Sequence, residues 1–265
     1  MAKKNLINKI DDLENDLVYL KNQNDNLTET LSFIKKMLSE NMEKTNYCPI
    51  CGQISSFESF GGREKVRCPI CGSLERHRLI YLLFERKFAN LLEEDIKVLH
   101  FAPEHFFYRF FDEKDNIDYY PVDFCPENFV NLDIKYKIDI RNIDFDKDTF
   151  DLIYASHVLE HIPEDIKAMR ELYRVLKPNG ICIVMVPLIN NPKTFENRKY
   201  NTPKLRLKHY GLEDHFRIYG WDIKEKLSSV GFEVEEINAE NILTTDEFSS
   251  DNYRLRDEVA FICKK

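Results

Sequence analysis

The chain has 265 residues, a formal net charge of −8 and a pI near 5.5. This length accommodates one sizeable domain with smaller accessory parts, since domains usually run to roughly 100–200 residues. The negative charge repels polyanions at long range, which disfavours a nucleic-acid substrate and favours chemistry on small molecules or glycans.

Hydrophobic runs are short throughout the sequence. The longest, such as residues 181–187, fall far below the roughly 20 residues that span a bilayer. The first residues lead into a polar heptad pattern and lack the apolar core of a secretory signal. We therefore expect a cytoplasmic protein with no membrane insertion, in which the seven cysteines serve as thiols or metal ligands rather than in disulfides.

Residues 1–44 are predicted to form a coiled-coil helix. Apolar side chains recur between residues 6 and 38 at alternating steps of four and three, the repeat of a coiled coil. Asn24 is the polar residue of this seam, and at an a position it favours a parallel two-stranded pairing. We expect a parallel homodimer through residues 6–38; the alternative is an amphipathic helix packed on its own domain.

A repeated cysteine motif marks residues 45–73. Cys48-Pro-Ile-Cys51-Gly is answered by Cys68-Pro-Ile-Cys71-Gly, with 16 residues between the pairs. This spacing is typical of a four-thiolate zinc ribbon. The intervening segment is too short and polar to form a core, so the metal must supply much of its folding energy. Because four sulfurs close the coordination sphere, we assign the ion a structural role.

Strands alternate with helices after a connecting helix predicted for residues 74–94. Buried strands are predicted near residues 95–101, 117–123, 150–157 and 181–186. A helix with an apolar face precedes the last of these, and two final strands near 234–237 and 258–263 are expected to form an antiparallel edge. The alternation predicts an α/β fold over residues 95–265, with a doubly wound, mostly parallel sheet.

The chain resembles class I methyltransferases of the methyltransferase-11 group in two stretches, Phe150-Asp-Leu-Ile-Tyr-Ala-Ser-His-Val-Leu-Glu-His-Ile and Glu171-Leu-Tyr-Arg-Val-Leu-Lys-Pro-Asn-Gly180. It is similar, more narrowly, to a bacterial subgroup with a zinc ribbon in front, through Cys68-Pro-Ile-Cys-Gly-Ser-Leu-Glu-Arg-His-Arg, Val98-Leu-His-Phe-Ala-Pro-Glu and Asp214-His-Phe-Arg-Ile-Tyr-Gly220. Some members of that subgroup sit among surface-polysaccharide genes. The resemblance implies a Rossmann-like fold and methyl transfer from S-adenosylmethionine.

The resemblance also implies where the methyl donor binds, across the carboxyl ends of the strands at the topological switch point. The positions that correspond to the family's donor site are Phe101, Ala102, Pro103 and Glu104 beneath the methionine part, Asp123 at the ribose hydroxyls, Asp139 and Ile140 beside the adenine, and Ser156 and His157 facing the sulfonium. The sequence departs from the family in the first loop, where His100 stands at the usual acidic position and Ala102-Pro103-Glu104 replaces glycines.

Candidate catalytic groups follow the third strand. His157, Glu160 and His161 share one helical face if a helix starts near His157, and either histidine could accept a proton near neutral pH. A divalent ion held by Glu160, His161 and either His157 or His215 is a further possibility. It is similar to the metal sites of ubiquinone-biosynthesis O-methyltransferases and small-RNA 3′-end methyltransferases. The alternative is a helix-start residue with a satisfied histidine.

A cluster of polar side chains follows the predicted strand at 181–186. Asp214, His215, Arg217 and Tyr219 combine an acid, a base and a cation, which suits a polar or anionic acceptor that Arg217 could grip. The alternative is a salt-bridged loop. The basic stretch 193–209 is interpreted as a lid, an RNA-facing patch or a solvated loop. Arg76, His77 and Arg78 could reach the site from the connecting helix, or simply be solvated.

Together these features predict an S-adenosylmethionine-dependent methyltransferase that O-methylates a small polar or glycan-type acceptor, such as a surface-polysaccharide precursor. His157, His161 and His215 are its candidate bases, and zinc is its structural metal. One alternative is RNA methylation, because some ribosomal-RNA methyltransferases also carry an N-terminal zinc ribbon. Another is a non-catalytic scaffold assembled through the coiled coil and the zinc ribbon.

Overall fold

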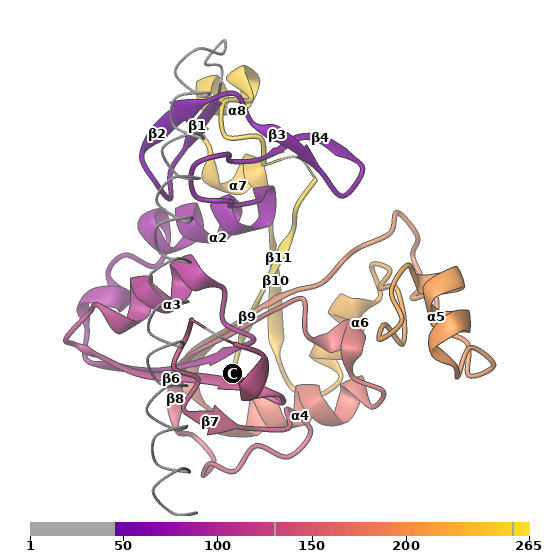
Figure 1. The fold of residues 1–265 in the computed structure, drawn as a ribbon. Helices are drawn as coiled ribbons and strands as arrows, with labels where there is room; N and C mark the ends of the chain where they lie inside the picture. The colour runs from indigo at the N-terminus through magenta and orange to yellow at the C-terminus, as the bar shows by residue number, and fades with distance from the viewer. Residues whose placement is uncertain (1–45, 130, 256) are drawn as a thin grey trace, which may run out of the picture. The chain divides into compact units, whose positions relative to one another are not determined.

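The computed structural model describes residues 46–129, 131–255 and 257–265 (Figure 1). The predicted coiled coil of residues 1–44 lies outside these ranges. The described chain divides into two compact units, one formed by residues 46–78 and 249–255 and the other by residues 79–248 and 257–265. No helix among the described residues is long and apolar enough to cross a membrane.

The smaller unit consists of two antiparallel hairpins. One pairs β1 (Asn46–Cys48) with β2 (Gln53–Ser55), and the other pairs β3 (Glu58–Phe60) with β4 (Arg63–Arg67). Residues 249–255 belong to this unit as well, because the Tyr47 amide donates to the carbonyl of Asn252 at 3.0 Å. The sequence did not predict this return of the chain.

The larger unit is built on a seven-stranded sheet in the order β10-β11-β9-β8-β5-β6-β7. All neighbours in this sheet are parallel except those of β11, which runs antiparallel to both β9 and β10. The strands are β5 (Ile96–Phe101), β6 (Ile117–Asp123), β7 (Tyr136–Lys137), β8 (Phe150–Ser156), β9 (Leu176–Met185), β10 (Glu233–Ile237) and β11 (Ala260–Lys264).

This order fits the Rossmann-like, doubly wound sheet predicted from the sequence. The two final strands, β10 and β11, form the antiparallel edge that the sequence predicts, whereas the short strand β7 was not expected. The helices are α2 (Glu75–Arg86), α3 (His105–Asp112), α4 (Asp165–Val175), α5 (Pro203–Tyr210), α6 (Ile223–Ser228), α7 (Ala239–Ile242) and α8 (Thr245–Ser250).

Side chains of the central strands alternate between the two faces of the sheet, as the period of a strand requires. On one face, Leu99 and Ile153 join the core that includes Leu172 of α4 and Leu227 of α6. On the other, the ring of Tyr154 lies 5.4 Å from that of Phe107 on α3. The connections after β5 and β8 therefore leave the sheet toward opposite faces, which opens space above the carboxyl ends of these two strands.

Candidate functional site

A pocket of about 470 Å³ lies at the carboxyl ends of β5, β6 and β8. Residues from each strand end contribute to it, together with the loop after β6 and the loop before α6. The lining residues are Phe101, Ala102, Asp123, Phe124, Cys125, Asn128, Ile138, Asp139, Ile140, Arg141, His157, Val158, His161, Ile162, Pro163, Asp214 and Phe216. The pocket lies where the reversal of strand order predicts a ligand.

Two of the lining residues adopt a left-handed backbone conformation. Ala102 follows β5 with φ +48°, and His157 follows β8 with φ +55°. This region costs a non-glycine residue of order 1 kcal/mol or more, and such strain tends to persist at functional sites. Ala102 thus makes the turn that glycine makes in the resembled family, so the absence of glycine does not prevent the chain from turning there.

Two carboxylates project from the loops on the β6 side. Asp123 Oδ1 accepts a hydrogen bond from the amide of Cys125 at 2.7 Å, which fixes the turn after β6. Asp139 forms a bidentate pair with Arg141, whose guanidinium holds the pKa of that carboxyl below its usual range. Both carboxylates are therefore oriented by the protein, and the second oxygen of Asp123 has no hydrogen-bond partner among the described residues.

Three of the predicted donor residues do not line the pocket: Pro103, Glu104 and Ser156. The Glu104 carboxylate instead lies 3.2 Å from Nε2 of the fully buried His100 and 3.4 Å from the Tyr154 hydroxyl. Nδ1 of His100 in turn lies 2.9 Å from the Tyr119 hydroxyl. The unusual histidine of the first loop therefore belongs to an internal polar network and holds Glu104 away from the pocket.

The segment after β8 does not begin a helix at His157, so the condition for placing His157, Glu160 and His161 on one helical face is not met. A 3₁₀ turn covers Leu159–His161, and α4 starts only at Asp165. His157 and Glu160 nevertheless meet, with Nδ1 3.3 Å from the Glu160 carboxylate. Nε2 of His157 has no hydrogen-bond partner among the described residues. A histidine with one nitrogen oriented by a carboxylate and the other free is suited to accept a proton.

Glu160, His161 and His215 converge from the 3₁₀ turn and the loop after α5. One potential ligand atom from each lies within 4.8 Å of the others. Glu160 is 1% exposed, and neither of its oxygens has a hydrogen-bond partner among the described residues. Burial, followed by repulsion from His161, lowers the pKa of His215, which favours the neutral imidazole that can bind a metal.

Asp214 completes this side of the pocket. Its carboxylate lies 3.0 Å from Nδ1 of His161 and is 70% exposed, so it orients His161 from the solvent side. The rings of His161 and His215 meet edge to face at 4.6 Å. The predicted acidic and basic residues at 214 and 215 are thus brought together with the Glu160 segment.

Arg217 and Tyr219, by contrast, point into the protein interior. The Arg217 guanidinium is 1% exposed and donates to the carbonyls of Leu159 and Pro163 and to the Glu196 carboxylate. Tyr219 is fully buried and its hydroxyl donates to Asp165 at 2.9 Å. Neither side chain is available to an acceptor, so the sequence prediction that they bind substrate is wrong, and both instead anchor the loop.

The pocket also contains residues that the sequence analysis did not single out. Phe124, Cys125 and Asn128 come from the turn after β6, and Arg141, Val158 and Phe216 complete the walls. Phe124 is 58% exposed, which is unusual for a phenylalanine and offers a flat apolar surface. The exposure of Phe124 could not be predicted from the sequence, because two apolar residues in a row, Phe124 and Cys125, are more typical of a buried segment.

The four motif cysteines of the smaller unit form a single cluster that could hold a metal ion. Cys48 and Cys71 lie 3.6 Å apart at sulfur, and Cys51 and Cys68 lie 3.8 Å apart. Zn–S bonds of about 2.3 Å place the sulfurs of a tetrahedral site roughly 3.8 Å apart, so the geometry suits zinc. Hydrogen bonds from its neighbours lower the pKa of Cys48, while the same contacts raise that of Cys51.

Arg78 is fully buried in the same unit and does not serve as a solvated residue. Its guanidinium donates to the carbonyls of Ser73, Val66, Tyr253 and Arg254 and lies 4.4 Å from the ring centre of Phe57. Burial lowers the pKa of Arg78, and the charge of the Cys48 thiolate opposes that shift. Arg78 therefore ties residues 249–255 to the cysteine unit and adds positive charge beside the thiolates.

Residues 110–184 match the family model of the methyltransferase domain. Two similar relatives are the sterol 24-C-methyltransferase of Debaryomyces hansenii, 34% identical over 37% of this chain and 26% of that protein, and the Caenorhabditis elegans sterol 4-C-methyltransferase strm-1, 37% identical over 28% of this chain and 24% of that protein. The chain thus aligns with about a quarter of each of these relatives.

The family match lies within the stretch 95–265 for which the sequence predicts a methyltransferase domain. Among solved structures, an S-adenosylmethionine-dependent methyltransferase from Archaeoglobus fulgidus is 17% identical, with a TM-score of 0.47 over 70% of this chain and 93% of that chain. A similarity of this size says nothing about the residues of the site. The relatives match too small a share of their length to transfer an acceptor.

Replacing Arg217 by methionine tests its structural role. Loss of the guanidinium removes its hydrogen bonds to the carbonyls of Ile162 and Pro163 and to the Glu196 carboxylate, and breaking a buried pair typically costs about 3–5 kcal/mol. We expect a large fall in the urea midpoint of unfolding. Lys224→Met, at an exposed ion pair, is the matched control and is expected to change stability by less than about 0.5 kcal/mol. Equal stability of the two variants would contradict the structural role of Arg217 and favour the original prediction that it binds the acceptor.

Proposed function

We propose that the chain is an S-adenosylmethionine-dependent methyltransferase whose donor occupies the pocket at the carboxyl ends of β5, β6 and β8. The observation that carries the proposal is the composition of this pocket. Phe101, Ala102, Asp123, Ile140 and His157, from four successive segments of the chain, all line it. The match of residues 110–184 to the methyltransferase domain supports the same reading.

Each part of the pocket has a defined task in this proposal. Asp123 accepts hydrogen bonds from the ribose hydroxyls, while Asp139 and Ile140 flank the adenine. The left-handed turn at Ala102 lets the backbone after β5 pass close beneath the methionine part. Pro103 shapes that turn, and Glu104 supports it through His100 rather than by touching the donor. Ser156 ends β8 beside His157, at the point where the methyl group is transferred.

Asp123→Asn tests the donor site. Asparagine retains the shape of the turn but loses the charge, and hydrogen bonds to a charged group contribute about 1.5–3 kcal/mol, so we expect at least about tenfold weaker binding of S-adenosylhomocysteine. Isothermal titration calorimetry measures the affinity. Asp115→Asn, an exposed change in the turn before β6, is the matched control. Equal affinity in both variants would remove Asp123 from the donor site.

A hydroxyl acceptor must lose a proton when it takes the methyl group. The donor supplies an activated methyl group, so the protein mainly contributes orientation and a base. We propose His157 as that base, since its buried Nε2 has no hydrogen-bond partner among the described residues and Nδ1 faces the Glu160 carboxylate. The new oxygen–carbon bond forms as the carbon–sulfur bond breaks, and the acceptor proton passes to Nε2. Glu160 then stabilises the charged imidazole.

A divalent ion at Glu160, His161 and His215 is the second part of the proposal. The buried carboxylate without hydrogen bonds is the observation that favours it, because an uncompensated buried charge is costly. One carboxylate and two imidazoles suit Mn²⁺, Fe²⁺ or Zn²⁺, and three protein ligands leave coordination positions open. Such an ion would supply Lewis acidity beside the acceptor hydroxyl. His157 and Asp214 would orient the ligands from either side.

His215→Ala tests the ion. Loss of one of three protein ligands is expected to weaken Mn²⁺ binding by at least about tenfold. Mutation of residues that only orient a metal ligand already lowers metal affinity by about 10–100-fold. Electron paramagnetic resonance of Mn²⁺ provides the readout, because the four-cysteine cluster prefers softer metals. His105→Ala, an exposed histidine at the start of α3, is the control. No Mn²⁺ bound by the unaltered protein at millimolar concentration would exclude the site.

The acceptor is proposed to be a small polar or glycan-type molecule that is methylated on oxygen. The net charge of −8 opposes RNA, although the basic stretch 193–209 keeps RNA methylation as the alternative. The relatives are sterol methyltransferases, but this chain aligns with only about a quarter of their length, so their sterol acceptor is not carried over to it. A non-catalytic scaffold would need no open donor pocket. The parallel homodimer through residues 6–38 and the cytoplasmic location stay predictions.

We further propose that Cys48, Cys51, Cys68 and Cys71 bind one structural zinc ion. Cys68→Ser is expected to reduce bound zinc to a small fraction of one per chain and to unfold the smaller unit, because structural zinc supplies roughly 10–16 kcal/mol of folding free energy in zinc-finger peptides. Elemental analysis gives the zinc content. Cys125→Ser, outside the cluster, is the control. Full zinc occupancy in the Cys68 variant would contradict the assignment.

A further inference from the structure

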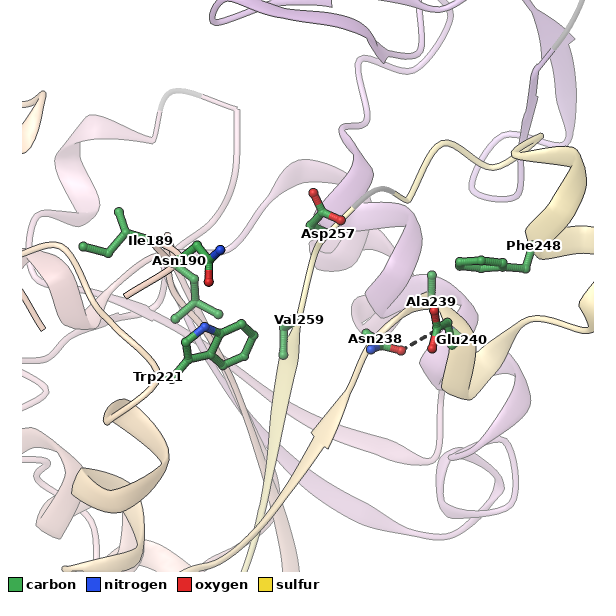
Figure 2. A pocket seen from close by; sticks show the side chains of 10 residues that line it. Ile189, Asn190, Trp221, Asn238, Ala239, Glu240, Phe248, Asp257 and Val259 are labelled. Atoms are coloured by element: carbon green, nitrogen blue, oxygen red, sulfur yellow. Dashed lines mark hydrogen bonds between the residues drawn. The ribbon is translucent and has the colours of Figure 1, made fainter. Parts of the chain in front are cut away.

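A second cavity of about 540 Å³ lies at the same edge of the sheet as the donor pocket, beyond β9, β10 and β11. Its residues come from the segments after β9 and β10 and before β11, from the turn before α6, and from α7 and α8. Figure 2 shows Trp221 and Asn190 on one wall, Asn238 and Glu240 on the other, and Val259 between them. None of these residues is part of the proposed donor site.

The lining of this cavity combines flat apolar surfaces with hydrogen-bonding groups. Trp221 and Phe248 are 38% and 46% exposed, so their rings are open to a ligand. Leu188, Ile189, Ala239 and Val259 complete the apolar part, while Asn190, Asn238, Glu240 and Asp257 supply polar groups. No ion pair joins Glu240 or Asp257 to any described residue, and no lysine or arginine lines the cavity.

This charge distribution restricts the ligand. Two carboxylates without a facing cation repel phosphates, carboxylates and nucleotides. They also disfavour a steroid, because covering a carboxylate with hydrocarbon removes its water without replacing the hydrogen bonds. Hydroxyl or ammonium groups, in contrast, donate to carboxylates and to the side-chain oxygen of Asn190. The Asn238 oxygen already accepts from the Glu240 amide at 3.0 Å, which leaves its NH₂ group to donate.

The cavity lies beside the carboxyl end of β9, the strand next to the one that ends at the proposed site of methyl transfer. β8 and β9 are neighbours, Ser156 pairs with Met185, and the amide of His157 donates to the Met185 carbonyl at 2.9 Å. Leu188, the first residue of the cavity wall, follows Met185 by three positions. A ligand held against Trp221 therefore occupies the strand end next to the one that carries His157.

We propose that this cavity is the acceptor site and that it takes a sugar ring that is uncharged or carries an amino group. The apolar face of the ring lies on Trp221, and its hydroxyl or amino groups donate to Glu240 and Asp257. This inference rests on the proposed methyltransferase function. It replaces the anionic acceptor that the sequence suggested, since Arg217 is not available to bind one.

The chain offers a direct probe, because Trp221 is its single tryptophan. The experiment titrates the full protein, with S-adenosylhomocysteine present, with the methyl glycosides of glucose, galactose, mannose and rhamnose and with glucosamine, and follows tryptophan emission. We expect at least one of these probes to change the emission saturably. Glucose 6-phosphate is expected to bind at least about tenfold more weakly than glucosamine, because the carboxylates repel it.

Two variants test the polar groups. Glu240→Gln and Asp257→Asn are each expected to weaken binding of the responding sugar by about fivefold or more, since each loses a hydrogen bond to a charged group. Glu93→Gln and Asp95→Asn are the matched controls, because both residues are exposed and precede β5 at the amino ends of the strands. Both variants are expected to bind the sugar as the unaltered protein does. Melting temperatures establish that all four variants fold.

The outcomes separate this inference from the proposed function. Binding of S-adenosylhomocysteine with no response to any sugar overturns the sugar site and leaves the methyltransferase intact. Stronger binding of glucose 6-phosphate, or a response only to cholesterol carried by cyclodextrin, overturns the charge argument. A sugar response that Asp123→Asn leaves unchanged, followed by transfer of labelled methyl to that sugar in the unaltered protein, supports the assignment. Failure of S-adenosylhomocysteine to bind contradicts the proposed function itself.

Discussion

The reversal of strand order between β5 and β8 is the constraint on which the candidate site depends. The chain leaves β5 toward β6 and β7, then returns to add β8 on the other side of β5. The connections after these two strands must therefore diverge, and the space between them is a pocket that side chains of neither connection fill. Ala102 and His157 occupy the two diverging turns, and both adopt the left-handed conformation.

A buried polar network fixes the loops above this opening. Arg217 joins the loop before α6 to the carbonyls of the 3₁₀ turn after β8, and the Phe216 amide donates to the carbonyl of Glu160 at 2.8 Å. Gly220 lies in the same loop, where a Cβ would approach the Asn191 carbonyl to 2.5 Å. These contacts hold His215 beside His161 although 54 positions separate them in the chain. Loss of the network would therefore destabilise the fold and also remove the contacts that keep the two imidazoles together.

Much of this architecture follows from local sequence patterns. Alternating strands and helices predicted the parallel sheet, and the strand ends predicted the positions of Asp123 and His157, because parallel strands place their carboxyl ends at one edge. Long-range packing could not be predicted in the same way. The burial of Arg217 and Tyr219 depends on Asp165 and Glu196, which lie far away in the sequence. The return of residues 249–255 to the cysteine unit depends on Arg78, whose four carbonyl partners form no sequence motif.

The placement of charge separates the two cavities at the carboxyl edge chemically. The lining of the pocket beside β5 includes Arg141 and two histidines as well as its carboxylates, so its charges are partly balanced. The cavity beside β9 contains acidic and amide groups with no balancing cation among the residues that line it. A zwitterionic donor suits the first environment, whereas a ligand rich in hydrogen-bond donors suits the second. The acidic net charge of the chain has a local counterpart in Glu240 and Asp257, at the cavity that we propose as the acceptor site.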